Sequence, residues 1–269
     1  MHTIKDSLGD RMKGYENISR NYLTRKIPVI IRCDGRSFHN FCKGFQKPFD
    51  HVLMEAMQNT MKYLCENIQG CVLGYTQSDE ITLVLTDYAN IETDAWFEYN
   101  IQKMASVAAS MATMAFNKYF SEAVIASWVN ADDSDPVVRA HDKALEKGAM
   151  FDARCFSIPK EEVINCLIWR QQDATRNSIL SVAQSVFSHK EMQGVNCKDL
   201  QNKMLTEKDI NWNDYSIPEK RGTCCIKKSV MTKVDEGTNH DGLIRRNRWV
   251  IDKEIPIFTE DRNYVEKFL

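Results

Sequence analysis

Three carboxylates stand where apolar segments end, and their positions are chemically informative. Asp34 follows the largely apolar run Pro28–Cys33, and the pair Asp79-Glu80 lies between two further apolar runs. A carboxylate at the end of a buried strand is costly unless a cation or hydrogen bonds offset its charge. Oxygen ligands of this kind suit Mg²⁺, and a pair of such ions supports transfer of phosphoryl or nucleotidyl groups. These residues therefore predict a two-ion site, although Asp-Gly after a strand is also a common turn.

The segments around these carboxylates predict a strand, a helix and a hairpin. The β-branched run 29–33 is typical of a buried strand, and apolar residues at spacings of three and four predict a helix over 53–68. Two further apolar runs, 71–76 and 81–85, predict a hairpin whose turn spans 77–80. The order of these elements is β-α-β-β.

This order brings the acidic residues to one place. A helical crossover makes the first two strands parallel, and the hairpin makes the third strand antiparallel to the second. We therefore expect Asp34 and Asp79 to share one edge of the sheet, with Glu80 beside them as a third carboxylate. Gly35 would let a backbone carbonyl approach an ion closely.

A second helix and a fourth strand complete the predicted unit. Apolar residues at helical spacing predict a helix from about Ala95 to Phe120, and Phe151–Phe156 alternates as a strand does. Between them, 131–136 lacks the glycine and distal glutamate of a calcium loop and predicts a linker. Asp152 is either a further acidic group near the site or a partner for Arg154. We expect an α/β (α+β) fold with a β-α-β-β-α-β antiparallel sheet and helices on one face.

The remaining third predicts an added helical region followed by a short β-rich tail. An apolar stripe over 179–186 indicates a helix, and Ser188 with Glu191 forms a capping-box pattern. Basic residues recur in this region, including 220–221 and 245–248, and Trp249 follows the second group. Such residues suit RNA because Lys and Arg neutralise phosphates and aromatics stack on exposed bases, but they also suit an ordinary solvated surface. We divide the chain into 1–158 and 159–269.

Composition limits the classes of function. The chain has 269 residues, of which 43% are hydrophobic and 27% charged, and its formal net charge is −2. It is not strongly basic, so RNA binding would depend on local patches or on patches pooled across subunits. Nine cysteines in no CxxC metal pattern, without a secretion signal, predict reduced thiols and a cytoplasmic location. No apolar run approaches membrane-spanning length, so we expect no membrane partner.

Four blocks of the sequence resemble a known family in their order and content. They are Arg32–His39, Lys47–Asp50, Gly74–Glu80 and Phe151–Arg154. These blocks are similar to those of the tRNA(His) guanylyltransferase superfamily, and the likeness runs from about Met12 to about Gly222.

The resemblance implies a magnesium-dependent nucleotidyltransferase with a polymerase-palm-like catalytic domain over 1–158. Its substrates would be nucleotides and a tRNA, which it would extend at the 5′ end in the 3′ to 5′ direction. ATP would adenylylate a 5′-monophosphate, and the 3′-hydroxyl of an incoming nucleotide, usually GTP, would then displace AMP. The family also implies a homotetramer, with 159–269 contributing tRNA contacts and oligomer packing.

One segment favours a particular branch of this superfamily. Eukaryotic histidine-specific members carry His-Ile-Asn-Asn-Leu-Tyr-Asn after the Phe-Asp-x-Arg block, whereas this chain has Val163–Trp169 and agrees at three positions. The following Arg170–Ser178 resembles the guanylyltransferase-like branch of 3′–5′ RNA polymerases. This likeness implies template-dependent repair or editing of tRNA 5′ ends. Addition of one guanylate to tRNA(His) is the alternative.

Two other classes of protein stay open at this stage. A palm-fold nucleotide cyclase would share the acidic sheet edge, but it would act without RNA. A non-catalytic tRNA-binding module would use the acidic edge only for structure.

The resemblance also assigns roles to individual residues. The catalytic residues would be Asp34, Asp79 and Glu80. The two Mg²⁺ ions would bind Asp34, the Gly35 carbonyl and Asp79. The nucleotide site would comprise Arg32, Asp34, Gly35, Arg36, Ser37, Phe38, His39, Lys47, Ser78, Asp79 and Lys103. Apart from the resemblance, the polar and basic residues of the C-terminal region give the candidate tRNA contacts Arg170, Arg176, Asn177, His189, Lys190 and Arg221.

Overall fold

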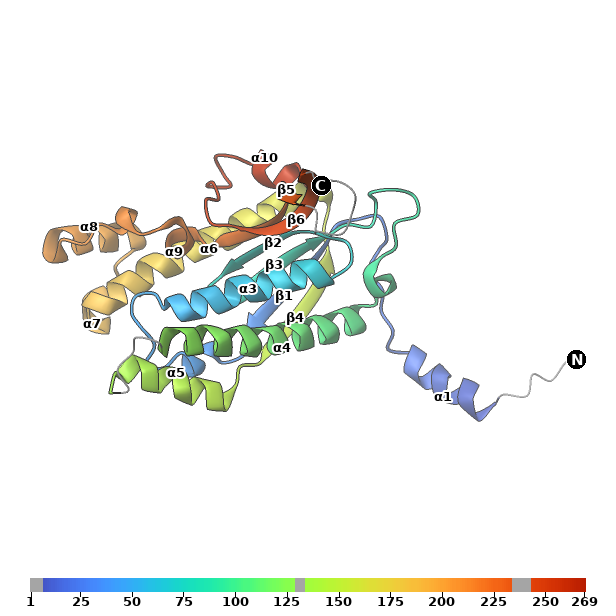
Figure 1. Cartoon of the computed structure of the whole chain (residues 1–269), viewed down its shortest axis with the longest axis horizontal. Helices are drawn as coiled ribbons and strands as arrows, with labels where there is room; N and C mark the ends of the chain where they lie inside the picture. The colour runs from blue at the N-terminus through green and yellow to red at the C-terminus, as the bar shows by residue number, and fades with distance from the viewer. Residues whose placement is uncertain (1–6, 129–133, 234–242) are drawn as a thin grey trace, which may run out of the picture.

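A six-stranded antiparallel sheet forms the centre of the computed structural model, which describes residues 7–128, 134–233 and 243–269 (Figure 1). The strands lie in the order β4-β1-β3-β2-β5-β6. Their bounds are β1 Val29–Gly35, β2 Cys71–Gln77, β3 Glu80–Leu85, β4 Phe151–Ser157, β5 Thr223–Lys233 and β6 Leu243–Asp252. Strands β1 and β2 both pair antiparallel with β3, so they are parallel to each other, as expected. The predicted β-α-β-β-α-β unit is confirmed.

Helices surround this sheet and project from it (Figure 1). Their bounds are α1 Leu8–Asn17, α2 Phe38–Phe41, α3 His51–Asn67, α4 Ile101–Ser127, α5 Pro136–Lys147, α6 Lys160–Val186, α7 His189–Met192, α8 Cys197–Lys208, α9 Ile217–Arg221 and α10 Asn263–Glu266. Short 3₁₀ helices, η1 Trp96–Tyr99 and η3 Trp212–Asp214, join some of them. No described helix is long and apolar enough to span a membrane.

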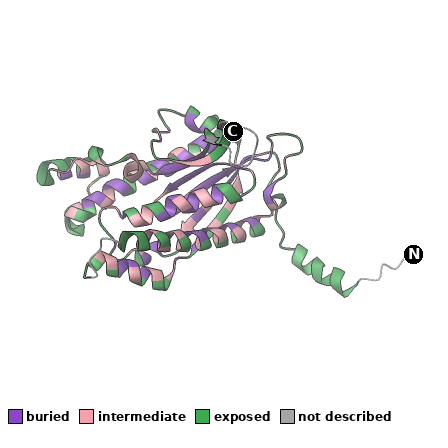
Figure 2. Ribbon diagram, in the orientation of Figure 1, coloured by how far each residue is buried: buried purple, intermediate pink, exposed green. Residues whose placement is uncertain are grey.

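The two faces of the sheet belong to separate cores. On one face, α3 and α4 cover three side chains of β1: Val29, Ile31 and Cys33. On the other face, Ile30 packs with residues of α6 and the C-terminal segment. The two crossover helices therefore share one face, as predicted, and α6 covers part of the other (Figures 1 and 2). Because strand side chains alternate, Arg32 and Asp34 lie on the α6 face.

The first crossover helix begins where the sequence predicts. The Asp50 side chain accepts a hydrogen bond from the Leu53 amide at 2.9 Å and caps α3. This bond satisfies an amide that has no partner within the helix.

The second crossover helix begins later than predicted. It starts at Ile101 rather than near Ala95, with Asn100 as its N-cap. Immediately before it, Phe97, Glu98 and Tyr99 have positive φ angles, which an α-helix cannot contain. Apolar residues in this segment continue the helical spacing of α4, so periodicity alone cannot locate the start of the helix.

The C-terminal region continues the sheet and also builds a core of its own. Strand β5 pairs with β2, while Ile179, Val182 and Leu200 centre a third apolar cluster. The predicted capping box of Ser188 and Glu191 is present at α7. The division between 158 and 159 falls between β4 and α6 and stays a prediction. Of the predicted linker, 131–133 lie outside the described residues, and Asp135 caps α5.

Candidate active site

The acidic edge predicted from the sequence is formed by the end of β1 and the β2–β3 hairpin. The hairpin turn consists of Ser78 and Asp79, and the Gly35 amide donates to the Asp79 carbonyl at 3.0 Å. Asp34 lies in register with Glu80 of β3. Segments that are distant in sequence therefore meet at this edge, as expected.

The two aspartates lie in different electrostatic surroundings. Burial raises the pKa of Asp79, and the charge of Asp34 adds to this rise, although hydrogen bonds from its own amide and Ser78 oppose it. The Ser78 hydroxyl donates to Asp79 Oδ1 at 3.0 Å. The Asp34 side chain is 41% exposed and lies 3.9 Å from an Arg154 nitrogen. The closer partner of Arg154 is Asp152, at 2.9 Å, which lies on the same strand, β4.

These oxygen atoms fit a hard divalent cation that also binds a substrate. Among the described residues, no group of three or more His, Cys, Asp or Glu side chains gathers as a ready cation site. Mg²⁺ in nucleotide enzymes commonly takes one or two carboxylates, with phosphates and water completing its shell. Asp34, Asp79 and a backbone carbonyl match that donor set, and the raised pKa of Asp79 indicates a carboxylate without enough compensating charge.

Gly35 is sterically required at this edge. A Cβ atom built on Gly35 would lie 2.2 Å from the Phe38 ring. That ring packs against Phe41, Phe116 and Phe151 in the core. Phe38 therefore anchors the loop after β1.

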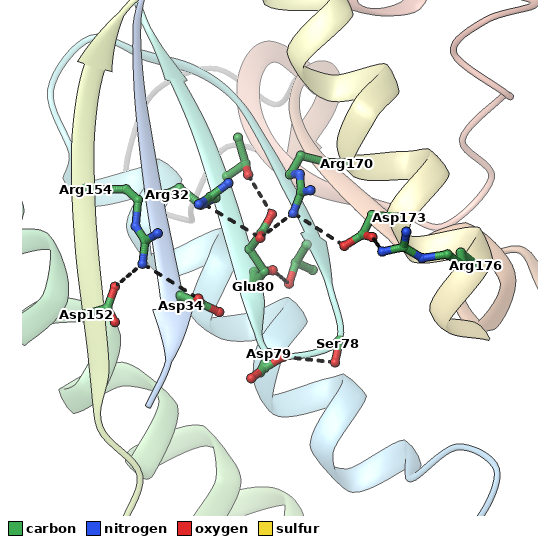
Figure 3. A network of polar contacts seen from close by, with 12 residues as sticks. Arg32, Asp34, Ser78, Asp79, Glu80, Asp152, Arg154, Arg170, Asp173 and Arg176 are labelled. Atoms are coloured by element: carbon green, nitrogen blue, oxygen red, sulfur yellow. Dashed lines mark hydrogen bonds and ion pairs between the residues drawn. The ribbon is translucent and has the colours of Figure 1, made fainter. Parts of the chain in front are cut away.

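Glu80 does not belong to the exposed acidic edge. It is the first residue of β3, only 7% exposed, and it faces α6. Arg170 lies 2.8 Å from its carboxylate and Arg32 lies 3.8 Å away (Figure 3). A carboxylate paired with two arginines is less open to an ion than Asp34 or Asp79, although burial still raises the pKa of Glu80; its catalytic role stays a prediction. Alternation along the strand points Asp79 and Glu80 in different directions.

The same contacts define the surroundings of Arg170. Its side chain is buried between Glu80 and Asp173, and its guanidinium carbon lies 3.6 Å from the centre of the Trp169 ring. Arg170 is therefore turned away from solvent in this structure, and its expected tRNA contact stays a prediction. Arg176 is exposed and also pairs with Asp173.

Other predicted nucleotide-binding residues surround the acidic edge. Arg36, Ser37 and His39 are exposed on the segment directly after Gly35. Lys103 is not near them. The Thr113 hydroxyl of α4 accepts a hydrogen bond from the Phe151 amide, so this turn of α4 lies beside the acidic edge. Lys103 lies nearly three turns earlier in α4, about 15 Å along the helix. A single chain therefore does not bring Lys103 to this site, contrary to expectation.

A cavity of about 390 Å³ adjoins the hairpin turn. Its wall includes residues that were predicted to be catalytic, to bind metal, to bind nucleotides or to contact tRNA: His39, Lys47, Ser78, Asp79, Asn177 and Arg221. Asn177 and Arg221, predicted to contact tRNA, therefore lie beside the expected nucleotide site. His189 and Lys190 do not, because they are exposed on α7, beyond the end of α6 (Figure 1).

The sequence interpretation missed part of this cavity wall. Gln58 and Thr223 are buried polar residues that line it, and the Thr223 hydroxyl has no hydrogen-bond partner among the described residues. Gly222 lies beside them with a φ of 81°, and a Cβ atom built on it would lie 2.4 Å from the Thr76 carbonyl oxygen. The Lys-Arg-Gly sequence was the only available signal, and it says nothing about pairing with β2.

A buried pair of side chains, Asp50 and His141, holds part of the cavity wall in place. His141 of α5 lies 2.9 Å from Asp50, which also accepts from the amides of Leu53 and Gln46. Burial alone would raise the pKa of Asp50, but the bond to His141 and the two amide bonds outweigh it and hold the pKa below its usual value. Asp50 thereby fixes both the start of α3 and the loop that carries Lys47.

We expect Asp50→Asn to lower the free energy of unfolding by about 1–2 kcal/mol at neutral pH, because it loses a charged hydrogen bond. A carboxyl group whose pKa is lowered in the folded state stabilises the fold at pH values above its ordinary pKa, near 4. This contribution is lost as the pH falls through the folded-state pKa. Urea unfolding between pH 3 and pH 7 should therefore show a flatter acid limb in the variant. Asp135→Asn, at the exposed cap of α5, is the matched control. Identical acid limbs for wild type and Asp50→Asn would contradict this assignment.

Two partly exposed carboxylates at one edge of the sheet, beside a nucleotide-sized cavity framed by basic residues, fit a nucleotidyltransferase of the palm type. Residues 9–159 match the family described as tRNAHis guanylyltransferase, and the chain belongs to this family.

Solved structures and curated relatives agree with this family. A bacterial tRNA(His) guanylyltransferase-like protein in complex with ATP is 46% identical, with a TM-score of 0.81 over 97% of this chain and 98% of that one. A second, in complex with GTP, is 42% identical, with a TM-score of 0.77 over 98% and 99%. A probable tRNA(His) guanylyltransferase of Dictyostelium discoideum is 25% identical over 88% of each chain.

Proposed function

We propose that this protein adds nucleotides to the 5′ end of tRNA in the 3′ to 5′ direction, following the opposite strand as template. The observation that carries the proposal is the edge shared by Asp34 and Asp79, beside a cavity large enough for a nucleoside. The two similar bacterial proteins, in complex with ATP and with GTP, support nucleotides as substrates. The likeness of Arg170–Ser178 to the guanylyltransferase-like branch supports template dependence.

The proposed reaction has two stages. First, an oxygen of the RNA 5′-monophosphate attacks the α-phosphorus of ATP, which releases pyrophosphate and leaves an adenylylated 5′ end. Then the 3′-hydroxyl of an incoming nucleotide, usually GTP, attacks the RNA 5′-phosphorus and AMP departs. A substrate that already carries a 5′-triphosphate needs only the second stage.

The chain's own groups have distinct tasks in this proposal. Asp34, Asp79 and the Gly35 carbonyl would hold two Mg²⁺ ions, whose chemistry is to stabilise negative charge on the attacking and leaving oxygens. Arg36, with its fork of donors, orients a triphosphate, and Lys47 adds a point charge at the cavity wall.

The experiment that tests the proposal uses purified protein with a 5′-truncated, 5′-monophosphorylated tRNA, ATP, Mg²⁺ and each labelled nucleotide in turn. Incorporation that follows the opposite-strand base supports template-dependent repair. Guanylate addition regardless of that base supports the alternative, tRNA(His)-specific addition, which the names of the curated relatives favour. Turnover of triphosphate without RNA, or no incorporation at all, contradicts both.

A basic ribbon supports RNA as the second substrate. Strand β5 starts at the acidic edge, opposite Thr76, and leaves the sheet beyond Ile226 at the opposite end. Past that point β5 and β6 pair only with each other, and their exposed residues include Lys227, Lys228, Arg245, Arg246 and Arg248. Lys228 lies directly opposite Arg248, and its Nζ is 3.3 Å from a carboxylate oxygen of Asp252, so the uncompensated positive charge of the ribbon lies mainly on its arginines.

We expect the double variant Arg246→Ser with Arg248→Ser to weaken tRNA binding without changing ATP binding. Each lost phosphate contact should lower the slope of log K against log salt by about 1. Fluorescence anisotropy from low to high salt measures that slope. Lys62→Ser with Lys118→Ser, on α3 and α4, is the control of equal charge change. A slope equal to that of wild type would contradict contact between the ribbon and phosphates.

Two further properties belong to this proposal. We infer a homotetramer, in which basic patches on neighbouring chains serve one tRNA, because a net charge of −2 provides little attraction from one chain alone. Light scattering at assay concentration tests the tetramer. We also infer a cytoplasmic location, where tRNA is available.

A further inference from the structure

An exposed tryptophan stands on α6 beside the acidic edge. The side chain of Trp169 is 52% exposed, although the preceding and following turns of α6 are packed onto the sheet and the third core. The guanidinium carbon of Arg170 lies 3.6 Å from the centre of its ring, and that of Arg32 lies 5.6 Å away. Arginines at these distances support the orientation of the ring. The indole is therefore held in place while half of it remains open.

This tryptophan is close to the proposed reaction centre. Arg32 precedes Asp34 by two residues in β1, which is about 7 Å along a strand. Arg32 also lies in register with Arg154 of β4, and Arg154 lies 3.9 Å from Asp34. Trp169 and Asp34 therefore lie on the same face of the sheet, with Arg32 and Arg154 near both of them.

Of the two arginines near the ring, Arg154 has donors open to a ligand. The Nε of Arg32 also lacks a hydrogen-bond partner among the described residues, but it is buried and faces Glu80, whose carboxylate oxygen is 3.8 Å away. Arg154 is about half exposed beside Asp34 and Asp152 (Figure 3). An open aromatic ring flanked by guanidinium groups has the chemistry that recognises an unpaired base and its phosphates.

We propose that Trp169 stacks on a nucleobase at the 5′ end of the RNA while Arg154 contacts the adjoining phosphate. The inference rests on the proposed function and deepens it, because it assigns the face of the sheet on which the RNA end lies. A free nucleotide fits this position less well than RNA. Trp169 is not part of the wall of the 390 Å³ cavity, and an open ring retains a base only when the rest of the molecule is held elsewhere. The basic ribbon can supply that hold.

Binding measurements on the full chain test the proposal without requiring catalysis. The probe is a 5′-truncated, 5′-monophosphorylated tRNA labelled at its 3′ end, and its affinity is measured by fluorescence anisotropy. We expect Trp169→Ala to weaken binding about 5- to 150-fold, the range that loss of one stacked base produces. Trp169→Phe keeps an aromatic face and should stay within about threefold of wild type. Trp128→Ala removes another half-exposed tryptophan, 41% exposed at the end of α4, and should bind as wild type does.

A second readout does not depend on the alanine variant folding. Tryptophan emission of the wild type should fall when the RNA binds, and Trp169→Phe should lose that fall while still binding. Equal RNA affinity for wild type and Trp169→Ala overturns the inference. If Trp169→Ala loses as much affinity for ATP as for RNA, the inference is overturned in favour of a mononucleotide at this ring. If the variant changes oligomeric state but keeps its RNA affinity, the inference is overturned in favour of a subunit contact.

The inference and the proposed function can fail separately. A wild-type protein that binds RNA through Trp169 but adds no nucleotide refutes the proposed function and leaves the stacking intact. If the wild type adds nucleotides and Trp169→Ala binds RNA normally, the stacking is refuted and the proposed function stands. Absence of RNA binding by the wild type overturns both.

Discussion

Asp79→Asn is expected to reduce nucleotide addition at least about 10³-fold without unfolding the protein. Ion-assisted stabilisation of transition-state charge supplies several kcal/mol, and about 4 kcal/mol corresponds to this factor. Asparagine matches aspartate in shape but carries no charge. Because burial raises the pKa of Asp79, removing its charge should leave the free energy of unfolding unchanged or slightly higher.

Single-turnover addition of a labelled nucleotide to the adenylylated RNA measures the effect on chemistry alone. Ser78→Ala, in the same turn, removes the hydroxyl that donates to Asp79 and is the matched control, with an expected loss of only a few-fold. A rate for Asp79→Asn within threefold of wild type would show that this carboxylate has no part in the reaction.

Glu80→Ala is expected to act on stability, lowering the free energy of unfolding by about 3–5 kcal/mol. Its loss leaves Arg170 buried without its closest partner and Arg32 without the carboxylate it faces (Figure 3). Adding Arg170→Met to Glu80→Ala removes the unpaired charge, so the double variant should recover part of the loss.

Urea unfolding of the four proteins in this cycle measures the coupling between Glu80 and Arg170. Glu66→Ala, which removes an exposed partner of Lys62, should cost no more than about 1 kcal/mol and serves as control. If Glu80→Ala left stability unchanged and abolished nucleotide addition, the result would contradict the structural role and support the predicted catalytic role of Glu80.

Local patterns in the sequence carry much of the fold. The hairpin and the first crossover helix follow from apolar spacing and from the cap at Asp50, because these signals arise within a few residues. The shared edge of Asp34 and Asp79 then follows from chain connectivity. The start of α4 could not be predicted, because Phe97, Glu98 and Tyr99 adopt left-handed backbone conformations that side-chain patterns do not record.

The surroundings of Glu80 and Arg170 could not be predicted, because they depend on contacts distant in sequence. Glu80 looked catalytic because its partner, Arg170, lies 90 residues away on a helix whose packing face was unknown. Arg170 looked exposed for the same reason. Likewise, the cavity wall at Thr223 exists only because β5 pairs with β2, and no local signal specifies that pairing.

The central claim is that Asp34 and Asp79 together hold a pair of divalent cations, and electron paramagnetic resonance of Mn²⁺ on the ATP-bound protein tests it most directly. We predict a spin-coupled pair of ions per chain in the wild type, and loss of that pair in Asp34→Asn and in Asp79→Asn while ATP remains bound. The same coupled signal in all three proteins, or no coupled pair in the wild type at saturating Mn²⁺, would contradict the account.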